Sequence, residues 1–131
     1  MRQGDREALA GWHELADAEG GAQVLVITRA GEDEPLGVVE YRVDGRRKAL
    51  LVEYVGVSPS LRGFGLGSEA VRVVEAGAFE RGKARRLEAE VGPEEGLALY
   101  FWLRLGCRPS LWPSESGKGK IVLTREMGAK A

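Results

Sequence analysis

The sequence contains only one cysteine, Cys107, and one histidine, His13. A single cysteine excludes a disulfide within the chain and suits a reducing compartment. One cysteine and one histidine cannot supply a zinc site of the usual kind, so we expect no metal. A Ser-His-Asp triad would need His13 as its base. We interpret His13 instead as a surface or substrate-side residue, and Cys107 as a small apolar residue at a helix exit.

Long apolar runs and an excess of charge of one sign are also lacking. The charged start, Met1–Glu7, leads into no apolar run, which argues against a signal peptide. No stretch approaches the ~20 apolar residues that a membrane span requires. The formal net charge of -1 gives no reason to expect nucleic acid or a membrane as a partner. We expect a cytoplasmic protein with a single domain over residues 1–131.

The apolar periodicity, with the Gly and Pro breaks, predicts a mixed α/β protein. Strand Ala49–Val57 is apolar on both faces, which is typical of a central strand. We therefore expect a mixed, mostly antiparallel central sheet with helices on both faces. The predicted elements are a helix at Asp5–Ala18, strands at Ala22–Arg29, Leu36–Val43 and Ala49–Val57, a helix from about Leu66 to Gly82, a strand at Arg86–Val91, a helix at about Glu94–Leu105, and a hairpin at Pro109–Glu126 with its turn at Ser116–Gly119.

The helix that starts near Leu66 shows a clear apolar stripe with charged residues opposite. The stripe is Leu66, Ala70, Val73, Val74 and Ala78, and the residues opposite are Glu69, Arg72, Glu75 and Glu80. We expect the stripe to be buried and the charged residues to face solvent.

The segment Val57–Ser68 joins the predicted central strand to this helix and contains three alternate glycines. Glycines let the backbone turn its N–H groups inward and approach a ligand closely. The helix start adds unpaired N–H groups and a partial positive charge. A strand, a glycine-rich turn and a helix start together predict an anion site, most naturally for phosphate.

Known phosphate motifs narrow the ligand. A dinucleotide fingerprint requires glycine at position 68, where Ser68 stands, and the P-loop pattern is absent. The pattern that matches is R-x-x-G-x-G, formed by Arg62, Gly65 and Gly67 after V-x-P. Further on, Ala98-Leu99-Tyr100 precedes Leu105-Gly106-Cys107. These two motifs, in this order and on these elements, resemble the GNAT superfamily of N-acetyltransferases from about Gln23 to the C-terminus.

The resemblance implies a fold of the GNAT type and acetyl-CoA as co-substrate, with its acetyl group transferred to a primary amine. It implies a pyrophosphate held by the turn and a pantetheine arm paired with the strand before it, with an oxyanion contact from a backbone N–H near Val55. The residues so implied are Val55, Gly56, Val57, Arg62, Gly63, Phe64, Gly65, Leu66, Gly67 and Ser68. The acceptor amine is not readable from these motifs.

Amine acetylation needs a base, and Glu53 is the first candidate. It is a charged side chain within an otherwise apolar strand, where partial desolvation would make its carboxylate a stronger base. GNAT members often place a glutamate near this point. The alternative is a structural ion pair with Arg42 or Arg47.

Glu90 is the second candidate base, near the end of the following strand. Its neighbour Glu88 shares its face by alternation, and two charges on one face usually indicate solvent. Tyr100 falls on the position that the resemblance assigns to the general acid, where a phenol protonates the leaving thiolate. The alternative is that Tyr100 only packs.

The sequence departs from the family in two places. Gly92-Pro93 stands where an asparagine often contacts the pantetheine. Only about twenty residues precede the first predicted strand, so we expect either that the family's first strand is missing or that an upstream domain preceded it. Strand Ala22–Thr28 would then be an exposed apolar edge, which predicts a homodimer or a partner domain that covers it.

Two functions other than catalysis stay open at this point. One is a non-catalytic acyl-CoA-binding or regulatory module with the same fold and loop. The other is an interaction domain of a larger protein. A base and an acid, Glu53 and Tyr100, favour the enzyme, because a protein that only binds acyl-CoA needs neither.

Overall fold

The structure is a computed structural model of the chain, and it describes residues 11–14, 22–28, 30–32, 34–63, 65–110 and 119–127. The chain forms two compact units. The first unit comprises Met1–Arg42 and Val52–Ala76, and the second comprises Val43–Leu51 and Gly77–Ala131. Within the described ranges, no helix is both long and apolar enough to cross a membrane.

Within the described residues, seven strands form one sheet in the order β1-β2-β3-β4-β5-β7-β6. The predicted mixed α/β fold is confirmed, and β4 takes the central place that its two-sided apolar pattern predicts. The bounds of β4 and β5 also agree with the sequence prediction. The elements are β1 (His13–Glu14), β2 (Gln23–Thr28), β3 (Pro35–Asp44), β4 (Ala49–Val57), the 3₁₀-helix η2 (Pro59–Leu61), α2 (Leu66–Glu80), β5 (Arg86–Val91), α3 (Gly96–Arg104), β6 (Arg108–Pro109) and β7 (Ile121–Glu126).

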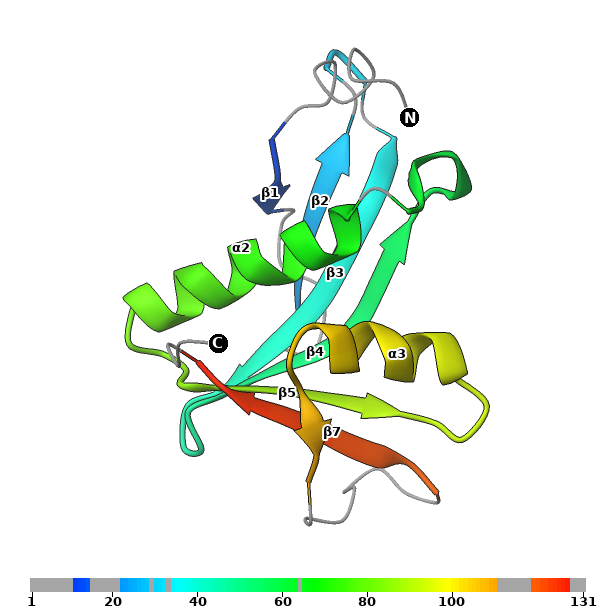
Figure 1. Cartoon of the computed structure of the whole chain (residues 1–131). Coiled ribbons are helices and arrows are strands. Elements are labelled where there is room, and N and C mark those ends of the chain that lie inside the picture. Colours follow the sequence, from blue (N-terminus) through cyan, green and yellow to red (C-terminus); the bar gives the residue numbers. More distant parts are fainter. Residues whose placement is uncertain are drawn as a thin grey trace. The chain divides into compact units, whose positions relative to one another are not determined.

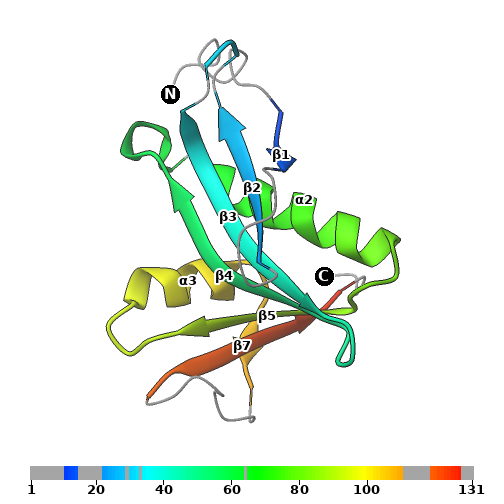
Figure 2. The same ribbon diagram turned by 180° about the vertical axis from the view of Figure 1, so that it is seen from behind.

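The first unit is built on the antiparallel pair β2 and β3, which runs in register from Gln23↔Tyr41 to Ile27↔Gly37. Helix α2 lies across one face of these two strands, as Figures 1 and 2 show from opposite sides. Apolar side chains from the strands and the helix fill the space between them and exclude water. The fully buried ones include Val26, Val39, Leu66, Ala70 and Val71.

The start of the chain differs from the sequence prediction. Residues His13 and Glu14 form strand β1, which pairs antiparallel with Val26 and Leu25 of β2. The predicted helix Asp5–Ala18 is therefore wrong at these positions, and its remaining residues other than Gly11 and Trp12 lie outside the described ranges. The physical reason is the apolar edge of β2, whose open N–H and C=O groups accept a neighbouring strand. A strand thus precedes β2, and the edge does not by itself call for a second subunit at Leu25 and Val26.

The stripe on α2 is mostly confirmed. Leu66, Ala70, Val74 and Ala78 are buried, but Val73 is 42% exposed. Val71 is fully buried in its place, so the buried face of the helix is rotated slightly about the helix axis from the predicted face. The helix ends where Gly82 adopts a positive φ of 68°, as the predicted glycine stop requires.

The second unit contains the antiparallel pair β5 and β7, in register from Arg86↔Glu126 to Val91↔Ile121. The two residues of β6 extend this pairing along Thr124 and Leu123 of β7. Helix α3 contacts β5 and buries Trp102, whose ring meets the ring of Phe101 edge-on at a centroid distance of 5.0 Å. Gly106 follows with a positive φ of 91°, which confirms the predicted end of this helix.

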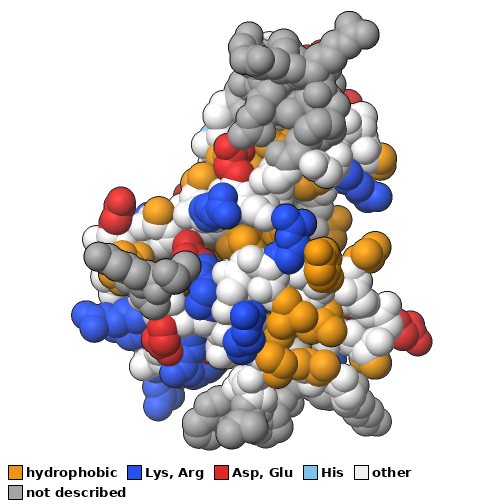
Figure 3. Space-filling model, viewed as in Figure 1, with side chains coloured by type: hydrophobic (Ala, Val, Ile, Leu, Met, Phe, Trp, Pro, Cys, Tyr) orange, Lys and Arg blue, Asp and Glu red, His pale blue; other side chains and the backbone are white. Residues whose placement is uncertain are grey.

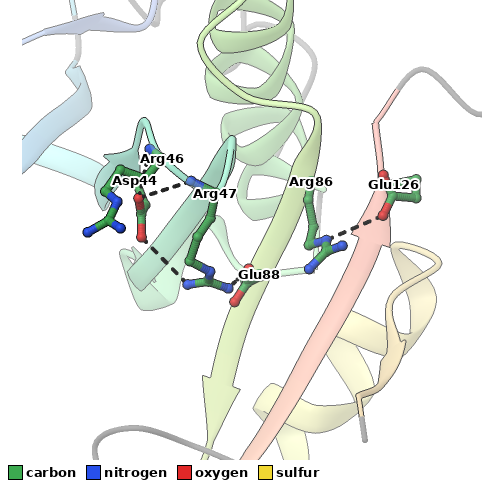
Figure 4. Close-up of polar contacts among 6 residues, drawn as sticks. All are labelled: Asp44, Arg46, Arg47, Arg86, Glu88 and Glu126. Atoms are coloured by element: carbon green, nitrogen blue, oxygen red, sulfur yellow. Dashed lines mark hydrogen bonds and ion pairs between the residues drawn. The ribbon is translucent and has the colours of Figure 1, made fainter. Parts of the chain in front are cut away.

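Glu88 is an unexpected buried charge in this unit. Its side chain is only 7% exposed and forms an ion pair with Nη2 of Arg47, from the turn between β3 and β4. Figure 4 shows the same turn held together by Asp44, whose Oδ1 accepts hydrogen bonds from the backbone N–H groups of Arg46 (3.1 Å) and Arg47 (3.2 Å). The predicted solvent exposure of Glu88 is wrong, because a cation 41 residues away satisfies its carboxylate.

We expect Arg47→Ala to destabilise the protein by about 2 kcal/mol, because it leaves a buried carboxylate without its cation. This loss is smaller than the free-energy cost of breaking a fully buried ion pair, since the Arg47 side chain is 41% exposed. Thermal unfolding should show a midpoint lower by about 6–10 °C. Arg46→Ala is the matched control and should change the midpoint little, and an equal loss in both variants would contradict the assignment.

Candidate functional site

The glycine-rich turn belongs to the first unit and joins β4 to α2. It starts with η2, continues through Arg62, and contains two glycines with positive φ, Gly63 at 86° and Gly65 at 78°. Residues other than glycine rarely adopt this conformation, so both positions need glycine. Gly67 is already the second residue of α2, which places it in the helix start and not in the turn.

The two turn glycines have open space beside them. Among the described residues and apart from the chain neighbours, an added Cβ at Gly63 or at Gly65 would meet no atom within 4 Å. The first helical hydrogen bond of α2 runs from the N–H of Glu69 to the carbonyl of Gly65 (2.9 Å). The N–H groups of Leu66, Gly67 and Ser68 therefore precede it in the helix start, where they have no partner in the helix. The turn thus combines room for a ligand with N–H donors and a positive helix end, which suits an anion.

Apolar residues anchor both ends of the turn. Leu61 at its start and Leu66 at its end are 2% and 1% exposed and pack with Ile27 of β2. Arg62 is exposed, and its Nε donates to the carbonyl of Val57 at 3.2 Å. The N–H of Ser58 donates to the carbonyl of Leu36 on β3 at 2.7 Å. Phe64, which the resemblance places in the same site, lies outside the described residues.

The residues that the resemblance assigns to the pantetheine arm lie at the end of β4. Val55, Gly56 and Val57 are its last three residues, and all are half-buried. Tyr54 is 54% exposed, and its ring folds against Gly56, where an added Cβ would lie 2.4 Å from the phenol oxygen. Glycine at position 56 therefore leaves room for this ring on the same side of the strand.

Glu53 does not have the environment that the sequence predicts. Its side chain is 44% exposed, so the expected desolvation is wrong. Its Oε1 accepts a hydrogen bond from Nε of Arg42 at 2.5 Å, with Arg42 equally exposed. Residues 49–52 of β4 are largely buried and the exposure begins at Glu53, so the exposed end of the strand does not follow the alternation of its sequence. The pairing with Arg42 is the alternative that the sequence left open, and it holds the carboxylate in one direction.

The other two catalytic candidates belong to the second unit. Glu90 is exposed on β5 opposite Val122. Tyr100 is 61% exposed on α3, and Cζ of Arg104 lies 5.7 Å from the centroid of its ring. Figure 3 shows hydrophobic side chains gathered on the surface at α3, where Leu97 is 89% exposed. Tyr100 and the buried Trp102 thus face different sides of α3, which leaves the phenol open to a ligand.

Two residues near the turn escaped the sequence interpretation. Nε1 of Trp12 donates to Oε2 of Glu69 at 3.0 Å, across 57 residues of sequence. Glu69, expected to face solvent, is half-buried. No local pattern signals a contact over this separation, although an acidic residue in the first turn of a helix is itself a common feature. His13 and Cys107 lie as expected, His13 exposed on β1 and Cys107 fully buried after α3.

Comparison with known proteins gives a consistent picture. The model of the acetyltransferase (GNAT) family matches residues 2–107. No curated protein matches the sequence. A GNAT family acetyltransferase from Elizabethkingia anophelis with acetyl-CoA bound has a TM-score of 0.67 and 12% identity, with 92% of this chain and 99% of that one covered.

Two further solved structures share the fold. The IAA acetyltransferase from Bacillus cereus has a TM-score of 0.64 and 18% identity, covering 82% of this chain and 79% of its own. The PaiA N-acetyltransferase from Thermoplasma acidophilum, in complex with coenzyme A, has a TM-score of 0.67 and 9% identity, covering 81% of this chain and 61% of its own. These identities show the common fold. Since the family model covers most of the chain, and the glycine turn lies between a central strand and a helix, the protein belongs to the GNAT family of acetyltransferases.

Proposed function

We propose that this protein binds acetyl-CoA and transfers its acetyl group to a primary amine by direct attack of the amine on the thioester. The observation that supports this most is the geometry of the turn. Gly63 and Gly65 have positive φ with free space beside them, and the start of α2 follows at once. These residues fit a pyrophosphate, because backbone N–H groups at a helix start bind a doubly charged anion without a metal or a charged side chain.

The proposed roles divide the proton transfers between two residues. Glu53 accepts a proton from the substrate ammonium group, directly or through water, which frees the amine for attack, and Glu90 is the second candidate for this step. Attack of the amine nitrogen on the carbonyl carbon forms a C–N bond, and the C–S bond then breaks. Tyr100 donates a proton to the departing thiolate. A backbone N–H near Val55 stabilises the charge on the carbonyl oxygen.

One observation favours a second function, a non-catalytic acyl-CoA-binding module. The carboxylate of Glu53 forms an ion pair with Arg42 at 2.5 Å, and such a pair can hold β3 and β4 together without taking part in a reaction. A protein that uses this pair only for stability would still bind acetyl-CoA through its turn. The two functions therefore differ in turnover and not in binding.

Binding and turnover are measured separately to test the proposal. Acetyl-CoA at 100 times its dissociation constant should stabilise the native state by about 2.7 kcal/mol and raise the unfolding temperature. Release of free thiol from acetyl-CoA is then followed across small amines, amino acid derivatives and peptide N-termini. Stabilisation with turnover of at least one amine supports the enzyme, stabilisation without any turnover supports the binding module, and no stabilisation overturns both.

Tyr100→Phe provides a sharper test of the proposed acid. The substitution keeps the ring and its contact with Arg104 but removes the phenol proton. We expect the turnover number to fall about tenfold or more, while the affinity for acetyl-CoA stays unchanged, because the lost group acts only on the departing thiolate. An unchanged turnover number would assign Tyr100 to packing alone.

A further inference from the structure

The pyrophosphate turn rests on a small apolar base in the first unit. Leu61 and Leu66 flank the four residues 62–65 and are both buried against Ile27. Trp12 packs against this same cluster from the start of the chain. Because both ends of the turn are fixed in one cluster, the packing of that cluster decides where the N–H groups of the turn point.

The position of Trp12 depends on a glycine in β3. A Cβ added at Gly37 would lie 2.8 Å from Cη2 of Trp12 and 3.0 Å from Cγ2 of Ile27. The bare backbone of Gly37 therefore allows the indole to lie directly on the sheet. In this position, Nε1 of Trp12 reaches Oε2 of Glu69 at 3.0 Å in a partly buried hydrogen bond.

Glu69 is a negative charge next to a site that binds a negative charge. It lies in the first turn of α2, directly after the three N–H groups at the helix start, which precede the first hydrogen bond within the helix. The same helix end that attracts pyrophosphate attracts this carboxylate. A carboxylate turned towards the glycine turn would compete for its N–H donors and repel the phosphates.

We propose that Trp12 is a positioning residue for acetyl-CoA binding, because its indole N–H holds the Glu69 carboxylate towards the sheet and away from the phosphate groups. This inference rests on the proposed function, since it concerns the same turn. It assigns a role to the start of the chain, which none of the sequence motifs covers. Trp12 acts through Glu69 and through the base of the turn, and touches no reacting atom.

The test compares Trp12→Phe with the wild-type protein by isothermal titration with acetyl-CoA. Phenylalanine keeps an aromatic ring on Gly37 but has no donor for Glu69. We expect the dissociation constant to rise about three- to tenfold, the effect of one nearby like charge in water-like surroundings. The rise should shrink at high salt, since salt screens a repulsion between exposed charges, whereas a packing defect would persist.

Glu69→Gln is the matched variant, because it removes the charge and keeps an acceptor for the indole. It should bind acetyl-CoA at least as tightly as the wild type, and Trp12→Phe should cause no further loss in its presence. Glu69→Asp, whose shorter side chain keeps the charge but does not reach the indole, should weaken binding as Trp12→Phe does. Glu69→Asp also tests the inference if the Trp12→Phe protein does not fold.

Two results would overturn the inference while leaving acetyl-CoA binding intact. One is a Trp12→Phe protein that binds as tightly as the wild type. The other is an equal, salt-independent loss with and without the charge of Glu69, which would assign Trp12 to packing alone. A wild-type protein that does not bind acetyl-CoA at all is a different outcome, because it removes the proposed function and this inference with it.

Discussion

Glu53→Gln is expected to lower the turnover number by about 100-fold, the usual contribution of a general base, with acetyl-CoA affinity unchanged. Glutamine keeps the size of the side chain and can still accept a hydrogen bond from Arg42, but it cannot accept the proton of the amine. The carboxylate already has a fixed direction, because Nε of Arg42 donates to Oε1 at 2.5 Å. The second oxygen of the carboxylate can then receive the proton while Arg42 holds the first.

Three comparison variants separate this role from a structural one. Glu40→Gln removes another exposed glutamate of the first unit, on β3, and should leave turnover unchanged. Arg42→Gln removes the cation that orients Glu53 but leaves the carboxylate of Glu53 in place, so turnover should fall less than in Glu53→Gln. Glu90→Gln should stay close to the wild type. If Glu90→Gln shows the large loss and Glu53→Gln shows only a lower unfolding temperature, the roles of the two glutamates are reversed.

Sequence patterns predicted the elements whose structure is determined by residues close to them in the sequence. Strands β4 and β5 were predicted at their observed bounds because strand-breaking residues, Pro59 and the pair Gly92-Pro93, follow them. The glycine turn was predicted for the same reason, since positive φ and a helix start are local properties. Gly63 and Gly65 adopt the conformation that the motif requires.

Errors arose where a distant residue decides the outcome. Glu88 is buried because Arg47 lies across from it, and Glu69 is turned inward because Trp12 reaches it. Neither partner is within 40 residues, so alternation and helical spacing carry no information about the contact. Glu53 is a different case, because its partner Arg42 is only 11 residues away and was among the alternatives, whereas its exposure was not predicted.

The start of the chain differs from the sequence prediction because the open edge of β2 pairs with residues that have helical spacing. The sequence predicted that a second subunit or a partner domain covers the apolar edge of β2, and the structure shows β1 paired with that edge at Leu25 and Val26. The sequence assigned the preceding residues to a helix, because Leu9, Trp12, Leu15 and Ala16 have helical spacing. In the structure, His13–Glu14 pair with that edge, and Tyr41 of β3 donates to Oε1 of Glu14 at 2.6 Å. Trp12 turns to the base of the turn instead.

Gly65→Val tests the feature on which acetyl-CoA binding depends. Gly65 has φ of 78° and supplies the carbonyl that starts the hydrogen bonding of α2. A β-branched residue is strained at this φ, so the backbone must move to a negative φ and redirect the N–H groups of the turn. Charged hydrogen bonds contribute about 1.5–3 kcal/mol each, so losing one or two should weaken acetyl-CoA binding by about 100-fold.

Gly31→Val is the matched control, because Gly31 has nearly the same positive φ in a different turn. Its φ is 81°, and among the described residues, chain neighbours aside, an added Cβ there would also meet no atom within 4 Å. Both substitutions impose the same backbone strain, so both should lower the unfolding temperature of the free protein by a similar amount. Only Gly65→Val should lose affinity for acetyl-CoA in isothermal titration. Since the strain is common to both, the difference in affinity between the two variants measures what the turn itself contributes to holding the pyrophosphate, and equal affinities would exclude the turn from the binding site.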